Sequence, residues 1–168
     1  VLFAQPEQSL PLLRAAYARA EGPAKLAYAQ VLGIMGDPTG IDTLIAAVRD
    51  TKEWDKGWNY RGMGQFGRAL SPLDGYIVAL GRTRDQRAVP VIVEKLRLLT
   101  AEHDFSHHRA VGLALEMIGD RTAAQPLAEL LAKPEMTGHV HTSVAVARER
   151  GVPEGGNAVR TRRESLRE

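Results

Sequence analysis

The sequence of 168 residues contains no cysteine, few aromatic residues and no long apolar run. Without cysteine, the chain forms no disulfide, uses no thiolate nucleophile and builds no cysteine-based zinc site. No apolar stretch approaches the roughly 18 residues that a membrane helix requires. Aromatic residues make up only 5%, while alanine and leucine are frequent, which favours helix over sheet. We therefore expect a single soluble all-α domain without a membrane partner; the compartment is left open, the cytoplasm included.

The chain also lacks a basic stripe. Its net charge is +2, but residues 1–147 carry 16 basic and 16 acidic side chains. The surplus lies in the tail after Ala147, where six arginines face four glutamates. Nucleic-acid binders neutralise phosphates with clustered lysine and arginine. The even balance over most of the chain therefore predicts no nucleic-acid partner.

An internal repeat is present instead. Three segments follow one pattern: KLAYAQVLGIMGDPTGIDTLIAAV from Lys25, DGYIVALGRTRDQRAVPVIVEKL from Asp74 and HRAVGLALEMIGDRTAAQPLAEL from His108. In each, an apolar run of helical period is followed by a short turn and a second apolar run. Asp37, Asp85 and Asp120 lie in the turns and fit N-caps of the second helices. Pro23, Ser71-Pro72 and Ser106 mark the starts of the first helices.

Paired helices that recur in this way predict an α-α superhelix, a solenoid of about three helical-hairpin repeats with partial repeats at both ends. We expect repeats over about residues 9–20 (partial), 23–49, 71–99 and 106–132, insertions over 50–70 and 133–160, and a partial helix over 161–168. Because the pattern starts and stops within a repeat, we also expect the chain to be a fragment of a longer protein.

Two resemblances to known families also indicate a helical-repeat solenoid. The turn followed by A-x-x-P-L in GDRTAAQPLAELL resembles HEAT repeats of the short, bacterial lyase-like kind. The strings WDKGWNYRGMGQFGRALSPLD, FSHHRAVGLALE and LAKPEMTGHVHT resemble the C-terminal HEAT-repeat region of bacterial FAD-dependent oxidoreductases. This second resemblance implies a docking or substrate-shaping module next to a redox domain that binds FAD. It places no cofactor-binding and no catalytic residue in this chain.

Both tryptophans and all five histidines fall in or beside the junctions that follow the second helix of each repeat. Equivalent junctions of a solenoid lie along one edge, so we expect these residues to gather there and to contact another domain, a protein partner or a substrate. The predicted contact set is Trp54, Trp58, Tyr60, Arg61, Gln65, Phe66, Arg68, His107, His108, Arg109, His139 and His141. The alternative is that the aromatic residues only fill the edge of the core.

The glycines and histidines of these junctions bear on other possible activities. Gly62, Gly64 and Gly67 match the spacing of a dinucleotide fingerprint, but no hydrophobic strand precedes them. We instead expect Gly57 and these glycines to allow positive φ or close backbone approach. His103, His107, His108, His139 and His141 form an alternative metal-binding set. Adjacent helical side chains such as His107 and His108 point about 100° apart, which opposes it. A bilin lyase is a third option, by analogy with HEAT-like lyases.

Overall fold

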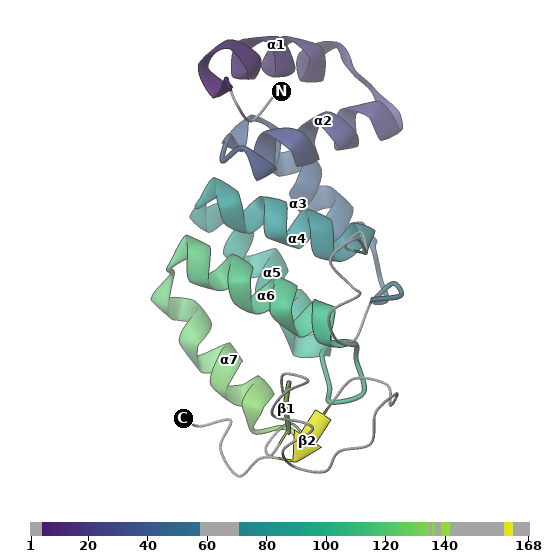
Figure 1. Ribbon diagram of the computed structural model, residues 1–168, viewed down its shortest axis with the longest axis vertical. Coiled ribbons are helices and arrows are strands. Elements are labelled where there is room, and N and C mark those ends of the chain that lie inside the picture. The colour runs from purple at the N-terminus through teal and green to yellow at the C-terminus, as the bar shows by residue number, and fades with distance from the viewer. Residues whose placement is uncertain (1–4, 58–70, 135, 137–138, 142–159, 163–168) are drawn as a thin grey trace.

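The computed structural model describes residues 5–57, 71–134, 136, 139–141 and 160–162, with side chains described up to Met136 (Figure 1). Within them lie seven α-helices: α1 (Pro6–Arg19), α2 (Gly22–Ile34), α3 (Ile41–Asp50), α4 (Pro72–Thr83), α5 (Val89–Leu98), α6 (Phe105–Ile118) and α7 (Ala124–Leu131). The expectation of an all-α fold is confirmed as seven packed helices. None of these helices has the length and apolar character that a membrane crossing needs.

The helices follow one another along the long axis of the molecule (Figure 1). Helix α2 packs on α4 and α4 packs on α6, which makes one layer. Helix α3 packs on α5 and α5 packs on α7, which makes a second layer, while α1 covers α2. Contacts between α2 and α3, α3 and α4, and α5 and α6 join the layers. The most extensive contacts therefore join α4 to α6 and α2 to α4, helices that lie two apart in the chain.

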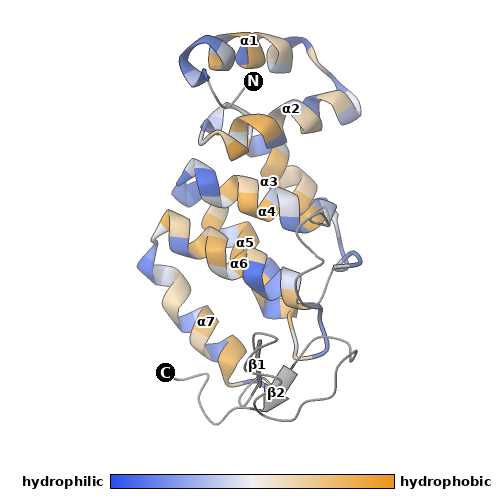
Figure 2. Cartoon of the chain, viewed as in Figure 1, coloured by the Kyte–Doolittle hydropathy of each residue, from blue (hydrophilic) through white to orange (hydrophobic). Residues whose placement is uncertain are grey.

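The apolar positions of the sequence explain this arrangement. Leu32, Leu44, Ile77, Leu80 and Ile92 are fully buried. Figure 2 shows orange apolar stretches along the helices, with blue polar residues concentrated at helix ends and in connections. Apolar residues at helical spacing bury one stripe of each helix, and burial of such a side chain contributes roughly 1.5–3 kcal/mol.

Helix starts follow the predicted signals with two corrections. Ser71 caps α4 by accepting a hydrogen bond from the Asp74 N–H at 3.1 Å, as predicted. The turn aspartates, however, cap short 3₁₀ turns: Asp37 caps η2 (Pro38–Gly40), and Asp85 and Asp120 do the same for η3 (Gln86–Ala88) and η4 (Arg121–Ala123). Each carboxylate reaches the N–H two residues on, and the α-helix begins after the turn.

The start of α6 is the second correction. Its N-cap is Asp104, and Ser106 lies inside the first turn as a buried residue. Asp104 has an extended backbone, which is the usual N-cap conformation. The predicted start was therefore two residues late.

Glycine allows the helices of the first layer to approach closely. A Cβ atom at Gly81 of α4 would lie 2.4 Å from the Cα of Ala114 in α6. Gly33 of α2, one repeat earlier, occupies the same position, and its Cβ would lie 3.0 Å from the Cβ of Ala79 in α4. The same device thus acts at two successive helix contacts.

Basic side chains satisfy carbonyl groups at helix C-termini. Arg82 of α4 donates to the Ile34 carbonyl at the end of α2. Lys95 of α5 donates to the Thr51 carbonyl at the end of α3. Lys133, just after α7, donates to the carbonyls of Arg97 and Leu99 at the end of α5, at 2.6 and 2.7 Å. A cation at a helix C-terminus also interacts favourably with the helix dipole.

At residues 161 and 162, the structure has a strand where a helix over 161–168 was expected. Strand β1 (His139–His141) pairs antiparallel with β2 (Arg160–Arg162), and Val140 lies opposite Thr161. Both of these central residues are β-branched and favour strands, which explains the extended backbone. Residues 163–168 lie outside the described part.

Candidate functional site

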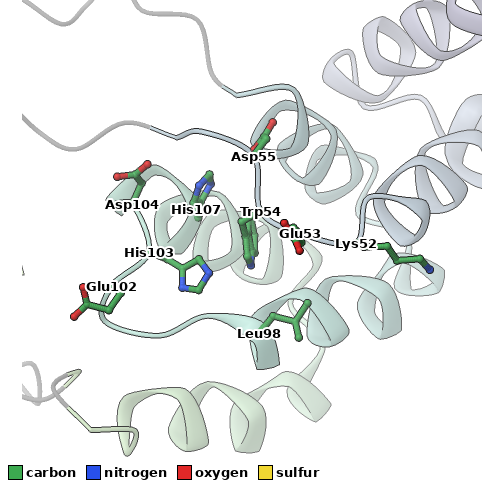
Figure 3. Close-up of a pocket in the computed structure, with 9 residues that line it drawn as sticks. All are labelled: Lys52, Glu53, Trp54, Asp55, Leu98, Glu102, His103, Asp104 and His107. Atoms are coloured by element: carbon green, nitrogen blue, oxygen red, sulfur yellow. The ribbon is translucent and has the colours of Figure 1, made fainter.

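The junctions after α3 and α5 meet beside a pocket. We call residues 51–57 the first junction and residues 99–104 the second junction. The pocket between them has a volume of about 480 Å³. Figure 3 shows the side chains that line it: Lys52, Glu53, Trp54, Asp55, Leu98, Glu102, His103, Asp104 and His107. Lys133 donates to the Leu99 carbonyl, so the start of the segment after α7 lies beside the second junction.

Trp54 connects the first junction to α6. Its ring lies 4.5 Å from the ring of His107, centroid to centroid, and is tilted by 34°. The His103 ring is 6.3 Å away and meets the indole edge-on. The indole N–H of Trp54 is buried and donates to no acceptor among the described residues. Packing therefore accounts for the ring of Trp54, but it leaves the nitrogen unexplained.

His107 and Asp74 form a buried pair beneath Trp54. The Nδ1 atom of His107 lies 2.7 Å from Oδ1 of Asp74, and the two residues are 1% and 0% exposed. Because a carboxylate only accepts hydrogen bonds, Nδ1–H is the donor. The other carboxylate oxygen, Oδ2, has no hydrogen-bond partner in the described part of the chain. The pair joins α4 to α6 across 33 residues of sequence.

The pKa of His107 reflects two opposing effects. Burial lowers it, but the hydrogen bond from Nδ1 to Asp74 and the charges of Asp74, Asp55 and Asp104 outweigh burial and hold it above the usual value of 6.5. The imidazolium is therefore the favoured form over a wider pH range than for a free histidine.

Asp55 places a second carboxylate near this pair. Its Oδ2 accepts a hydrogen bond from the Leu73 N–H at 3.1 Å, at the start of α4. Its Oδ1 is buried and has no partner within the described ranges. A carboxylate at the N-terminus of a helix is stabilised by the helix dipole, so α4 holds the first junction in place through Asp55.

Gly57 fits against His107 because it lacks a side chain. A Cβ atom there would lie 2.6 Å from Cε1 and 2.7 Å from Nε2 of the imidazole. Of the two reasons expected for this glycine, close approach is confirmed; its φ is not in the positive range.

His103 is positioned by the second junction. Its Nδ1 lies 3.1 Å from the Thr100 N–H nitrogen and 3.0 Å from Thr100 Oγ1. Burial and the positive charge of His107 lower the pKa of His103. The two histidines therefore differ: His103 favours the neutral form and His107 favours the charged form.

The predicted contact set is only partly described. His107 is buried against Asp74, so its side chain is a support of the pocket and not a free surface group. His108 is partly buried with Nδ1 3.2 Å from the Asp104 carbonyl, and Arg109 is exposed on α6. The other members lie outside the described residues or, in β1, outside the described side chains: Trp58, Tyr60, Arg61, Gln65, Phe66, Arg68, His139 and His141.

The alternative metal set finds no support among the side chains described. No group of three histidine, aspartate or glutamate side chains there has the placement that a metal ion requires. His107 and His108 turn to different partners, Asp74 and the Asp104 carbonyl, in agreement with their adjacent positions on α6.

Asp55 and Asp74 are the residues that the sequence did not single out. One signal was available for Asp74. The repeat alignment puts it level with His108, one residue from His107, at the starts of first helices in successive repeats. Such helices are neighbours in a stacked array, so their first turns meet. For Asp55, which lies in the predicted insertion over 50–70, the sequence contains no comparable signal.

Comparison with protein-family models, with curated proteins and with solved structures finds no match to this chain. The fold and the site therefore stand on the geometry described above.

Proposed function

We propose that the chain is a HEAT-like α-solenoid that acts as an interaction module and has no catalytic role of its own. The support is the order of packing within the two layers together with devices that recur from one repeat to the next. Gly33 and Gly81 serve successive helix contacts of the first layer, and Lys95 and Lys133 serve the C-termini of α3 and α5, successive helices of the second layer. Stacked repeats of this kind present their connections along an edge that binds partners.

The pocket between the first and second junctions is the proposed contact site, and a basic side chain of a protein partner is the proposed occupant. The observation that carries this proposal is the lining of the pocket. It contains four carboxylates, Glu53, Asp55, Glu102 and Asp104, against two cationic side chains, Lys52 and the His107 imidazolium. Charge complementarity of this kind favours a lysine or arginine over neutral side chains.

Trp54 and Leu98 complete the pocket. Leu98 is 51% exposed and lies below the indole in Figure 3, so it offers an apolar surface to an occupant. Arginine and lysine carry an aliphatic stem that packs on apolar surface while the charged group reaches carboxylates. Arginine is also enriched at the centres of protein interfaces.

The resemblance to FAD-dependent oxidoreductases suggests which partner presents this side chain. We propose that the basic side chain belongs to an FAD-binding domain of the same polypeptide. This chain then contributes no group to the flavin site. The direct check is the reading frame upstream of Val1. A glycine-rich strand–turn–helix sequence there would support the proposal, and an upstream sequence without one would contradict it.

The pocket is tested with a minimal probe, N-acetyl-arginine methylamide, titrated into the ¹⁵N-labelled chain. We expect saturable shifts of the amides of residues 52–55 and 102–104 and of the Trp54 indole. The isosteric neutral probe N-acetyl-citrulline methylamide should cause none, because it lacks the charge that the carboxylates recognise.

A matched pair of variants sharpens this test. Glu102→Gln removes one carboxylate of the pocket and should weaken binding of the arginine probe several-fold, by about 1 kcal/mol for one charged contact. Glu116→Gln makes the same change on the exposed surface of α6 and should leave binding unchanged. Equal shifts with both probes, or shifts centred away from the two junctions, would show that the pocket is not the contact site.

A further inference from the structure

His107 is enclosed on three sides by groups that belong to other segments. Asp74 of α4 accepts its Nδ1–H. From the first junction, Trp54 covers the ring and Gly57 approaches the edge that carries Cε1 and Nε2. One side chain of α6 thus touches both α4 and the segment that forms one wall of the pocket (Figure 3).

The charged groups around His107 are mostly acidic. Asp74 faces it from α4, Asp55 from the first junction and Asp104 from the start of α6, and all three favour its charged form. His103 of the second junction interacts with it as a neighbouring base. No charged side chain of α5, which also packs on α6, acts on His107 in the described part of the chain. The imidazolium is therefore the group that balances these carboxylates.

Deprotonation would affect the two helices and the first junction differently. Neutral His107 keeps its Nδ1–H and its hydrogen bond to Asp74, so α4 and α6 stay joined. What disappears is the positive charge that faces Asp55. Half-buried Asp55 and fully buried Asp74 would then be carboxylates of like charge, each with one buried oxygen that lacks a hydrogen-bond partner within the described residues. An uncompensated buried charge is strongly destabilising.

Asp74 cannot move away, because it is fixed in α4. Asp55 lies in a non-helical segment, where the hydrogen bond from the Leu73 N–H is the contact that its release must break. We propose that protonation of His107 is a latch on the first junction: the imidazolium holds Trp54, Asp55 and Gly57 against α6, and its deprotonation releases them. Because Lys52, Glu53, Trp54 and Asp55 line the pocket, release removes one of its walls. The pocket is thereby regulated by pH.

The direction of the regulation follows from the pKa of His107, which lies above 6.5. The latch is closed at pH 6.5 and below and opens as the pH rises through the pKa of the folded protein. The link to partner binding rests on the proposed function, but the movement of the first junction does not. The two are therefore measured separately.

The movement is measured through Trp54. Trp58, which lies outside the described residues, is replaced by phenylalanine so that Trp54 is the single indole. Acrylamide quenching of its fluorescence is followed from pH 5.5 to pH 9, with circular dichroism to verify the helices. We expect the quenching constant to rise with pH, with a midpoint equal to the pKa of His107 measured by NMR of its imidazole protons. His103→Gln, a change of the other histidine that touches Trp54, should leave that transition in place.

Two variants decide the cause. His107→Gln should abolish the transition, because the amide takes no proton in this range. Should that variant lose its helices, Asp55→Asn gives the decision: it removes the charge that drives release, so the transition should disappear while His107 still titrates. A transition that persists in folded His107→Gln or in Asp55→Asn, or quenching that stays constant while His107 titrates, would overturn the latch.

The arginine probe separates this inference from the proposed function. Its affinity should fall in parallel with the rise in quenching. If the Trp54 transition occurs and probe affinity does not follow it, the latch stands and the proposed binding site fails. If the probe binds but neither signal depends on pH, the binding site stands and the latch fails.

Discussion

Two buried basic residues, His107 and Lys95, have pKa values that are shifted in opposite directions. His107 gains carboxylate partners, and its pKa is held above the usual value. Lys95 is 4% exposed and donates to the Thr51 carbonyl, a neutral group. Burial, together with the nearby charge of Lys52, lowers the pKa of Lys95. The charge of the partner thus decides whether burial stabilises or weakens the cationic form.

At this scale, we predict that Asp74→Asn lowers the free energy of unfolding by more at low pH than at high pH. The folded-state pKa of His107 exceeds its unfolded value near 6.5, so the contribution of the ion pair is fully present below that pH. It is lost as the pH rises through the folded-state pKa. Breaking a buried pair costs about 3–5 kcal/mol. Urea unfolding at pH 6 and pH 9 should show a larger loss at pH 6.

The control is the same substitution at an exposed ion pair. Asp42 lies 3.3 Å from Arg87, and the two side chains are 84% and 57% exposed. Asp42→Asn should change the free energy of unfolding by less than about 1 kcal/mol at both pH values. A loss for Asp74→Asn that is the same at pH 6 and pH 9 would mean that the charge of His107 contributes nothing.

At the scale of elements, the spacing between helices depends on which glycines face a neighbour. Gly81 of α4 meets the backbone of Ala114, whereas Gly112 of α6 has open space where a Cβ atom would be. Both lie inside helices, so their intrinsic helix propensities are equal. They differ only in packing, which makes them a matched pair.

We predict opposite effects for alanine at these two positions. Gly81→Ala should destabilise the protein by roughly 1–3 kcal/mol, because α4 and α6 must separate or shift. Gly112→Ala should stabilise it by roughly 0.5–1 kcal/mol, because alanine loses less backbone entropy in a helix. Thermal and urea unfolding of both variants measures the difference. Stabilisation by Gly81→Ala would show that the helices are not in such close contact.

Sequence reasoning predicted elements better than it predicted their joints. Helical periodicity and the prolines indicated the helices, since these signals are local. The caps at Asp37, Asp85 and Asp120 were assigned to the wrong kind of helix, because an aspartate followed by a 3₁₀ turn looks the same in sequence as one that caps an α-helix. The pairing of Asp74 with His107 was missed because it depends on how two helices stack.

At the scale of the whole molecule, each helix is stabilised by the helices packed on it, so its position along the long axis should set its local stability. Helix α4 contacts helices in both layers, while α1 packs mainly on α2. Two side-chain bonds also hold α1. Arg14 pairs with the buried carboxylate of Asp37, and the Tyr17 hydroxyl lies 2.7 Å from Oγ1 of Thr43. Elements with few packing contacts are the first to open.

We therefore predict that Tyr17→Phe speeds amide hydrogen exchange in α1 and leaves exchange in α4 unchanged. The substitution keeps the ring against α2 and α3 and removes only the bond to Thr43, worth about 0.5–1.5 kcal/mol. Exchange in α1 should accelerate roughly two- to twelvefold, since 1.4 kcal/mol is a factor of ten. The control Arg19→Ala alters an exposed residue of the same helix and should have little effect. Equal acceleration in α1 and α4 would mean that the helices open together as one unit and not from the end of the stack.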